Sequence, residues 1–136
     1  MNIALMAHNS KKEILTELCI AYKQIFSKHR LYATQKTGKV VSEGSGLKIY
    51  LFLPGNQGGV EQIGRHIAYN NIDMVIFLRN PTDSKEKDVY ASYILHLCDE
   101  YNIPAATNIA TAEILIHGLE RGELDWREIV NPQSKD

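Results

Sequence analysis

Two short segments of the 136-residue chain contain residue types that could hold a phosphate group. In the first, residues 34–38 (Thr-Gln-Lys-Thr-Gly), hydroxyl groups and Lys36 stand at an expected helix start, where backbone N–H groups attract anions. A plain turn with Thr37 as the helix cap explains the same residues. In the second, Gly58 and Gly59 precede a helical pattern and would let backbone amides approach a phosphate. A structural turn is the alternative there.

Three further loops contain polar side chains with two interpretations each. His8 could donate a hydrogen bond to a substrate oxygen or exchange a proton, or it could be a satisfied histidine at a strand end. Asn80 follows the central strand, which Pro81 ends, and could simply belong to a turn. Thr107 and Asn108 could contact a ligand or cap the helix that follows. Each loop alone is therefore a weak signal.

The hypothesis that these loops form one site is strengthened by the elements that must position them. Short apolar runs predict strands at 2–7, 30–33, 48–53, 74–78 and 103–107, and amphipathic segments predict helices at 11–27, 37–43, 60–70, 88–100 and 111–120, the last capped by Thr111. This alternation predicts an α/β fold: a single domain over residues 1–130, with a doubly wound parallel sheet and helices on both faces. Residues 131–136 are expected to be a flexible tail. Ligands of such folds bind beyond the carboxyl ends of the strands, so the polar loops should share one crevice.

The composition narrows the classes of partner. The formal net charge is −1 and charged residues make up 23% of the chain, so no overall field draws it to a nucleic-acid polymer or a membrane surface. No apolar run has the length of a membrane span, and no signal peptide is recognised, which predicts a cytoplasmic protein. Cys19 and Cys98 lie in apolar helical patterns and are expected to be packed thiols. We expect no metal and no cofactor.

The order of the motifs resembles the methylglyoxal synthase family, from Ile3 to about Arg127. The motifs are Ile-Ala-Leu-Met-Ala-His, Leu-Tyr-Ala-Thr, Thr-Gly, Gly-Gly-x-x-Gln-Ile-Gly, Asp-Met-Val-Ile-Phe-Leu-Arg-x-Pro, Ile-Pro-x-Ala-Thr-Asn and Thr-Ala-Glu. The resemblance implies a five-stranded parallel sheet, a homohexamer, and conversion of dihydroxyacetone phosphate to methylglyoxal and inorganic phosphate. In the family an aspartate takes the proton, a histidine polarises the substrate oxygens, and threonines, a lysine and glycine amides hold the phosphate.

Carried over position by position, the resemblance implies one ligand site. His8 is its catalytic candidate. The residues expected to bind the ligand or its phosphate are His8, Asn9, Lys12, Thr34, Lys36, Thr37, Gly38, Gly55, Gly58, Gly59, Val60, Asn80, Thr107 and Asn108. Val60 and Asn80 occupy positions of family aspartates, as does Asn9, and Lys36 replaces a threonine.

These replacements remove proton acceptors and add a positive charge. Loss of a general base commonly lowers a rate by a factor of roughly 100 to 10,000. Glu61 is a poor substitute for an aspartate at Val60, because adjacent helix positions point about 100° apart. We therefore expect a catalytically degenerate protein, not an enzyme, that senses or sequesters a phosphorylated small molecule or nucleotide.

Two alternatives remain open. The chain could be an active methylglyoxal synthase whose base has moved to another carboxylate: Glu61, Asp83, Glu86 or Asp88. It could also be a different lyase or hydrolase that uses His8, or serve a structural role in a hetero-oligomer.

Overall fold

A five-stranded parallel sheet forms the centre of the computed structural model, which describes residues 1–82 and 85–130. The tail expected at residues 131–136 lies outside the described residues. The strands have the spatial order β3-β2-β1-β4-β5, and their bounds are β1 Asn2–Ala7, β2 Arg30–Ala33, β3 Ile49–Leu51, β4 Met74–Leu78 and β5 Ala105–Ala106. The predicted α/β class with a five-stranded parallel sheet is thus confirmed.

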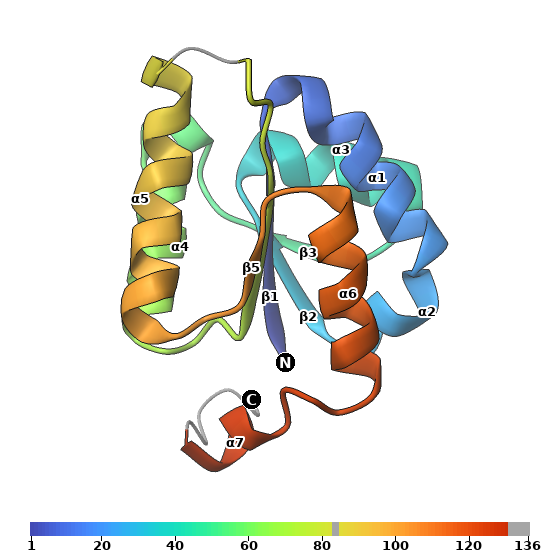
Figure 1. Ribbon diagram of the computed structural model, residues 1–136. Helices are drawn as coiled ribbons and strands as arrows, with labels where there is room; N and C mark the ends of the chain where they lie inside the picture. The colour runs from blue at the N-terminus through green and yellow to red at the C-terminus, as the bar shows by residue number, and fades with distance from the viewer. Residues whose placement is uncertain (83–84, 131–136) are drawn as a thin grey trace.

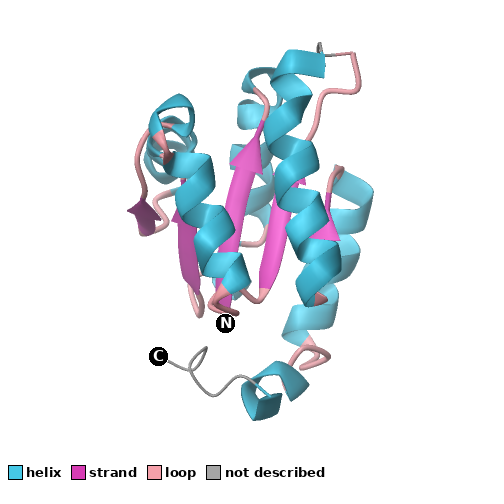
Figure 2. Ribbon diagram, turned by 90° about the vertical axis from the view of Figure 1, so that its left-hand side faces the viewer, coloured by secondary structure: helices cyan, strands magenta, loops and turns pink. Residues whose placement is uncertain are grey.

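Helices connect the strands and cover both faces of the sheet (Figure 1). Their bounds are η1 Asn9–Lys11, α1 Lys12–Ala21, α2 Lys23–Phe26, α3 Gln35–Ser45, η2 Gly55–Gln57, α4 Gly59–Ala68, α5 Lys85–Tyr101, α6 Ile109–Glu120 and α7 Trp126–Val130, where η marks a 3-10 turn. Helices α1, α3 and α6 pack on one face, and α4 and α5 pack on the other, which faces the viewer in Figure 2. All five residues of β4 are buried, as expected for a strand covered on both sides. No described helix has the length and apolar character of a membrane span.

Several element ends differ from the predicted ones for local reasons. The helix predicted at residues 11–27 is interrupted at Tyr22, whose φ of −113° and ψ of 29° lie outside the helical region. Helix α6 begins before Thr111, because the Asn108 Oδ1 accepts a hydrogen bond from the Thr111 N–H at 3.0 Å and caps the helix. Strand β5 has two residues only, and Pro104 before it has no N–H to give to a ladder. Helix α7 was not predicted.

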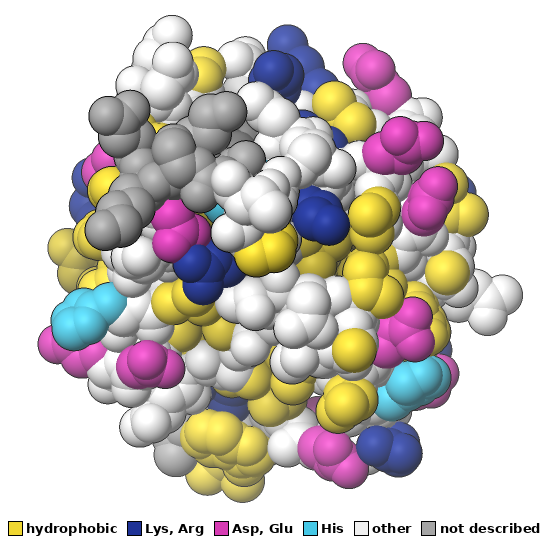
Figure 3. Space-filling view, turned by 45° about the horizontal axis from the view of Figure 1, so that its top comes forward, with side chains coloured by type: hydrophobic (Ala, Val, Ile, Leu, Met, Phe, Trp, Pro, Cys, Tyr) yellow, Lys and Arg dark blue, Asp and Glu magenta, His cyan; other side chains and the backbone are white. Residues whose placement is uncertain are grey.

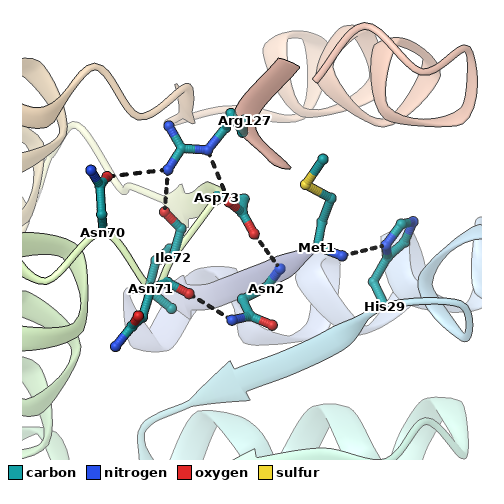
Figure 4. A network of polar contacts seen from close by, with 8 residues as sticks. All are labelled: Met1, Asn2, His29, Asn70, Asn71, Ile72, Asp73 and Arg127. Atoms are coloured by element: carbon teal, nitrogen blue, oxygen red, sulfur yellow. Dashed lines mark hydrogen bonds and ion pairs between the residues drawn. The ribbon is translucent and has the colours of Figure 1, made fainter. Parts of the chain in front are cut away.

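A buried ion pair attaches α7 to the amino end of the sheet (Figure 4). The Arg127 Nε lies 2.9 Å from the Asp73 Oδ1, and the two side chains are 1% and 0% exposed. Arg127 Nη2 also donates to the Ile72 carbonyl at 3.2 Å. The second carboxylate oxygen of Asp73 accepts from the Asn2 backbone N–H at 2.8 Å. Because hydrogen bonds satisfy both charges, the pair is tolerated inside the protein.

Removing the positive member of this pair should be costly. We expect Arg127→Met to lower the free energy of unfolding by about 3–5 kcal/mol, because the Asp73 carboxylate would stay buried without its cation. Urea unfolding followed by circular dichroism measures the change. Arg121→Met is the matched control, since Arg121 pairs with Glu123 only at the surface, where such a pair contributes about 0–1 kcal/mol. Equal losses in the two variants would contradict this account.

His29 lies next to the amino terminus at the same end of the sheet. The Met1 ammonium nitrogen is 3.3 Å from the His29 Nδ1. Burial, the adjacent ammonium group and Lys28 together lower the pKa of His29 to about 4, and Asp73 and Asp125 offset only part of this effect. The folded protein therefore keeps this imidazole neutral at a pH where an exposed histidine takes up a proton.

This difference makes stability depend on pH. Between about pH 6.5 and about pH 4 the unfolded chain binds a proton at His29 that the folded protein does not, so the free energy of unfolding should fall as the pH is lowered through this range. His66, whose pKa is lowered by burial and then by Arg65, contributes in the same direction. We expect His29→Gln to reduce the slope in urea titrations at several pH values. The exposed His96→Gln serves as control, and an unchanged slope in His29→Gln would refute the assignment.

Candidate functional site

A pocket of about 590 Å³ lies at the carboxyl ends of the strands. It is formed by the ends of β1 and β4, the starts of α1, α3 and α4, the segment after β3, and α5; its lining residues are Met6, Ala7, His8, Asn9, Ser10, Lys12, Thr34, Lys36, Thr37, Pro54, Gly55, Asn56, Val60, Phe77 and Tyr90. Figure 3 brings this end of the molecule forward and shows positively charged side chains among hydrophobic and uncharged ones. The crevice expected from the strand order is therefore present, and eight of the residues predicted from the sequence line it.

One side of the pocket is polar and positively charged. Thr34 occupies the position before α3 with an extended backbone, and Thr37 lies in the first turn of that helix; both are buried. The helix was predicted to begin at residue 37, but α3 begins at Gln35, so Thr34 rather than Thr37 occupies the cap position. Lys36 from the same turn and Lys12 from the start of α1 add two ammonium groups. This side can bind an anion through hydroxyls, a helix amino terminus and two cations.

The environment of Lys12 shows that the two cations affect each other. The Lys12 Nζ donates to the Asn9 Oδ1 at 2.7 Å. Burial lowers the pKa of Lys12, and the positive charge of Lys36 lowers it further. Asn9 orients the ammonium group but, being a neutral amide, does not compensate its charge.

His8 is fixed in one orientation between the two central strands. It is buried, its backbone N–H donates to the Leu78 carbonyl at 3.0 Å, and its ring packs edge-on against Phe77. The His8 Nδ1 accepts a hydrogen bond from the Asn80 backbone N–H at 2.9 Å. A ring nitrogen that accepts cannot carry the proton, so the neutral imidazole holds its proton on Nε2. His8 is thereby set up as a hydrogen-bond donor.

Asn80 acts on the pocket through other residues. Its Nδ2 donates to the Ser10 Oγ at 3.0 Å, and its Oδ1 accepts from the Thr82 N–H and hydroxyl at 3.0 and 2.7 Å. It is absent from the lining. These contacts join the loop after β4 to the loop after β1, which holds His8 in place.

The opposite side of the pocket is apolar and was largely missed from the sequence. Val60 was predicted, but Met6, Phe77 and Tyr90 were not. Met6 and Phe77 are directly paired in the register of β1 with β4. Alternation along these strands puts both on the α4 and α5 face, but a residue of this type gives no sign that it faces a ligand rather than the core. The remaining missed residues, Ala7, Ser10, Pro54 and Asn56, are neighbours of predicted ones in the same loops.

Five other predicted residues do not line the pocket: Gly38, Gly58, Gly59, Thr107 and Asn108. The Gly38 N–H donates to the Thr34 carbonyl at 2.8 Å, within the first turn of α3. Gly58 has a φ of 102°, which favours glycine. An added Cβ on Gly59 would lie 2.0 Å from the Leu53 carbonyl oxygen. The glycines thus shape the turns that bound the pocket, and Asn108 caps α6.

Two alanine substitutions distinguish a glycine that nearby backbone requires from a glycine that faces a movable side chain. Gly59→Ala should lower the free energy of unfolding by about 1–3 kcal/mol, because the new Cβ meets fixed backbone. In Gly38→Ala the new Cβ would lie 2.1 Å from the end of the exposed Leu51 side chain, and that side chain can move. Alanine also has a higher helix propensity than glycine. Thermal and urea unfolding of both variants measure the difference. The idea fails if Gly38→Ala is the more damaging.

A carboxylate is held beside the site by an arginine. The Arg79 Nε donates to the Asp88 Oδ1 at 3.0 Å, and Arg79 Nη2 pairs with Asp88 Oδ2. These contacts join the end of β4 to the first turns of α5. The hydrogen bonds from Arg79 lower the pKa of Asp88, and His8 contributes in the same direction. Glu61 is exposed and does not line the pocket, and the side chains of Asp83 and Glu86 lie outside the described residues.

Comparison with known proteins gives consistent matches. Residues 15–107 match the family model described as MGS-like domain. A methylglyoxal synthase of Caldicellulosiruptor saccharolyticus is 58% identical over 133 residues, which are 98% of this chain and 94% of the relative. A methylglyoxal synthase of Thermoanaerobacter sp. (strain X514) is 53% identical over 131 residues, 95% of this chain and 98% of the relative. The crystal structure of methylglyoxal synthase from Elizabethkingia anophelis is similar with a TM-score of 0.75 and 34% identity, covering 85% of this chain and 76% of that one.

These relatives overturn the function expected from the sequence. The chain was expected to be a catalytically degenerate binder and not an enzyme, which is wrong, since relatives up to 58% identical over nearly its whole length are methylglyoxal synthases. The expectation equated loss of acidic groups at three positions with loss of activity. Loss of these groups would abolish activity only if no other group in the site could accept the proton from the substrate. The alternative of an active enzyme is the better supported interpretation.

Proposed function

The chain belongs to the methylglyoxal synthase family, and on that premise we propose that it converts dihydroxyacetone phosphate to methylglyoxal and inorganic phosphate. The observation that carries the proposal is the 58% identity to a methylglyoxal synthase over 98% of the chain. The pocket supports it, because it combines groups that suit a phosphate with a histidine oriented as a donor.

In the proposed complex the phosphate group lies on the positive side of the pocket. Lys12 provides a cation, and the hydroxyls of Thr34 and Thr37 and the start of α3 provide hydrogen bonds. Gly55 lies at the pocket wall, where a small residue leaves room for the ligand. The carbon chain then extends from the phosphate toward His8.

His8 acts on the carbonyl group of the substrate. Its Nε2–H donates to the carbonyl oxygen and stabilises the negative charge that develops when a base takes a proton from the hydroxymethyl carbon. The resulting enediolate expels phosphate: the terminal hydroxyl gives its proton to the departing phosphate and becomes the aldehyde, the carbon–carbon double bond moves to the neighbouring carbon pair, and the bond between carbon and phosphate oxygen breaks. The enolate that remains takes back a proton from the base, at the carbon that carried the phosphate, and becomes methylglyoxal. The phosphate leaves with the electron pair of the broken bond, so no oxidant or cofactor is needed.

The proposal includes Asp88 as the proton acceptor, because we infer from the resemblance that Val60 and Asn80 occupy the positions of family aspartates. Asp88 is joined to the end of β4 by its bonds to Arg79 and stands beside the pocket, outside its lining. It is ionised at neutral pH, as aspartates ordinarily are, and can accept a proton, although the hydrogen bonds from Arg79 lower its pKa and make it a weaker base. Val60 is buried in the pocket wall and can neither accept nor donate one.

The cytoplasmic location and the homohexamer implied by the resemblance are part of the same proposal. Light scattering coupled to size-exclusion chromatography measures the assembly.

Release of methylglyoxal from dihydroxyacetone phosphate tests the function directly. We expect the wild-type protein to turn over, and His8→Gln and Asp88→Asn each to lower kcat by a factor of about 100 to 10,000. Glu61→Gln is the control and should retain activity, since Glu61 is exposed and does not line the pocket. Unfolding curves of each variant establish that it is folded. A wild-type protein without turnover would exclude the function, and an active Asp88→Asn would exclude Asp88 as the base.

A further inference from the structure

Two lysines from different helices line one pocket. Lys12 comes from the start of α1 and Lys36 from the first turn of α3, and these helices pack against each other. Within the described part of the chain, the lining contains no aspartate or glutamate, and neither lysine forms an ion pair with a carboxylate. The pocket therefore holds two positive charges that nothing in its described wall neutralises.

Such an arrangement is unfavourable without an anion. Lys12 is half-buried and Lys36 is exposed, so water and salt screen their repulsion less completely than between two exposed charges. Lys12 has a neutral partner, Asn9, and its pKa is lowered by burial and then by Lys36. Because both lysines line the same pocket and the charge of Lys36 acts on Lys12, the two ammonium groups can act on one ligand.

We propose that Lys36 is a second phosphate-binding cation, so that the site takes the phosphoryl group as a dianion held between Lys12 and Lys36. The proposal rests on the proposed function for the identity of the phosphoryl ligand. It adds a residue that determines which charge state of that ligand is bound. Threonines and one lysine could hold a monoanion nearly as well, whereas a second cation favours the additional negative charge.

The proposal predicts a particular pH dependence. Lys12 must be protonated to bind the dianion, so affinity should fall as the pH rises through the pKa of Lys12, which burial and then Lys36 keep below its ordinary value. Other titratable groups near Lys12 are His8 and Tyr90 in the lining and Lys11 and Glu13 beside it in the chain, and Asp88 is paired with Arg79. Without Lys36, this loss of affinity should move to higher pH.

Calorimetric titration with inorganic phosphate at neutral pH tests the proposal without turnover. We expect Lys36→Met to bind phosphate about 10- to 100-fold more weakly than the wild type, the effect of losing one charged hydrogen-bond donor. Lys39→Met is the matched control, because Lys39 is exposed on the same helix and does not line the pocket. The control should bind as the wild type does. Equal affinity in wild type and Lys36→Met, or equal losses in the two variants, would overturn the proposal.

Sulfate provides the second readout, because its charge does not change over the pH range of the experiment. Its affinity should fall at high pH in the wild type, and the fall should shift to higher pH in Lys36→Met. An unshifted curve would overturn the coupling of the two lysines. A protein that binds phosphate through Lys36 but does not release methylglyoxal would contradict the proposed function and leave this inference standing.

Discussion

The parallel pairing of β1 with β4 is the constraint on which the site depends. Five residue pairs align the strands, from Ile3 with Met74 to Ala7 with Leu78, and both strands are covered by helices on each face. The ladder continues by one bond, from the His8 N–H to the Leu78 carbonyl. Two residues later the Asn80 N–H reaches the His8 Nδ1. A shift of one residue in this register would exchange the faces of one strand relative to the other and remove the bond that sets the tautomer of His8.

Charged side chains are arranged in opposite ways at the two ends of the sheet. At the amino end, Arg127 and Asp73 are buried together and hydrogen-bonded by neighbouring backbone, so the charges compensate each other. At the carboxyl end, Lys12 and Lys36 share a pocket without a carboxylate in its described lining. The first arrangement holds α7 on the sheet. The second leaves electrostatic free energy that an anion can release, which is what a binding site requires and a stable core avoids.

The sequence predicted those parts of the molecule that local pattern controls. The bounds of β1, β2 and β4 match their apolar runs, because a buried parallel strand must be apolar on both faces. Asn108 was placed at a helix start, but which residue caps α6 depends on backbone geometry that the sequence does not specify. Helix α7 escaped prediction because it is short and is attached through Arg127, a contact between segments 54 residues apart in the chain.

The same limit explains the errors in the site. His8, Lys12, Thr34, Lys36 and Thr37 were found because polar residues after strands of a parallel sheet converge. Met6, Phe77 and Tyr90 have no such signature. The activity was misjudged because a list of replaced residues says what a site has lost and not which other groups stand near it. The proposed base Asp88 is such a group, since an arginine from another element holds it beside the pocket.

The positive side of the pocket bears on how an enzyme could work with fewer acidic groups in this wall. In the proposed elimination, negative charge moves from the carbon that loses its proton to the phosphate oxygen that departs. Cations placed at that oxygen stabilise the charge where it arrives, just as the Nε2–H of His8 stabilises it on the carbonyl oxygen. An additional aspartate in the wall would oppose that movement, whereas Val60 and Asn9 do not. The replacements that the resemblance implies are therefore compatible with the proposed activity, in a site that relies more on stabilising the leaving phosphate and less on a strong base.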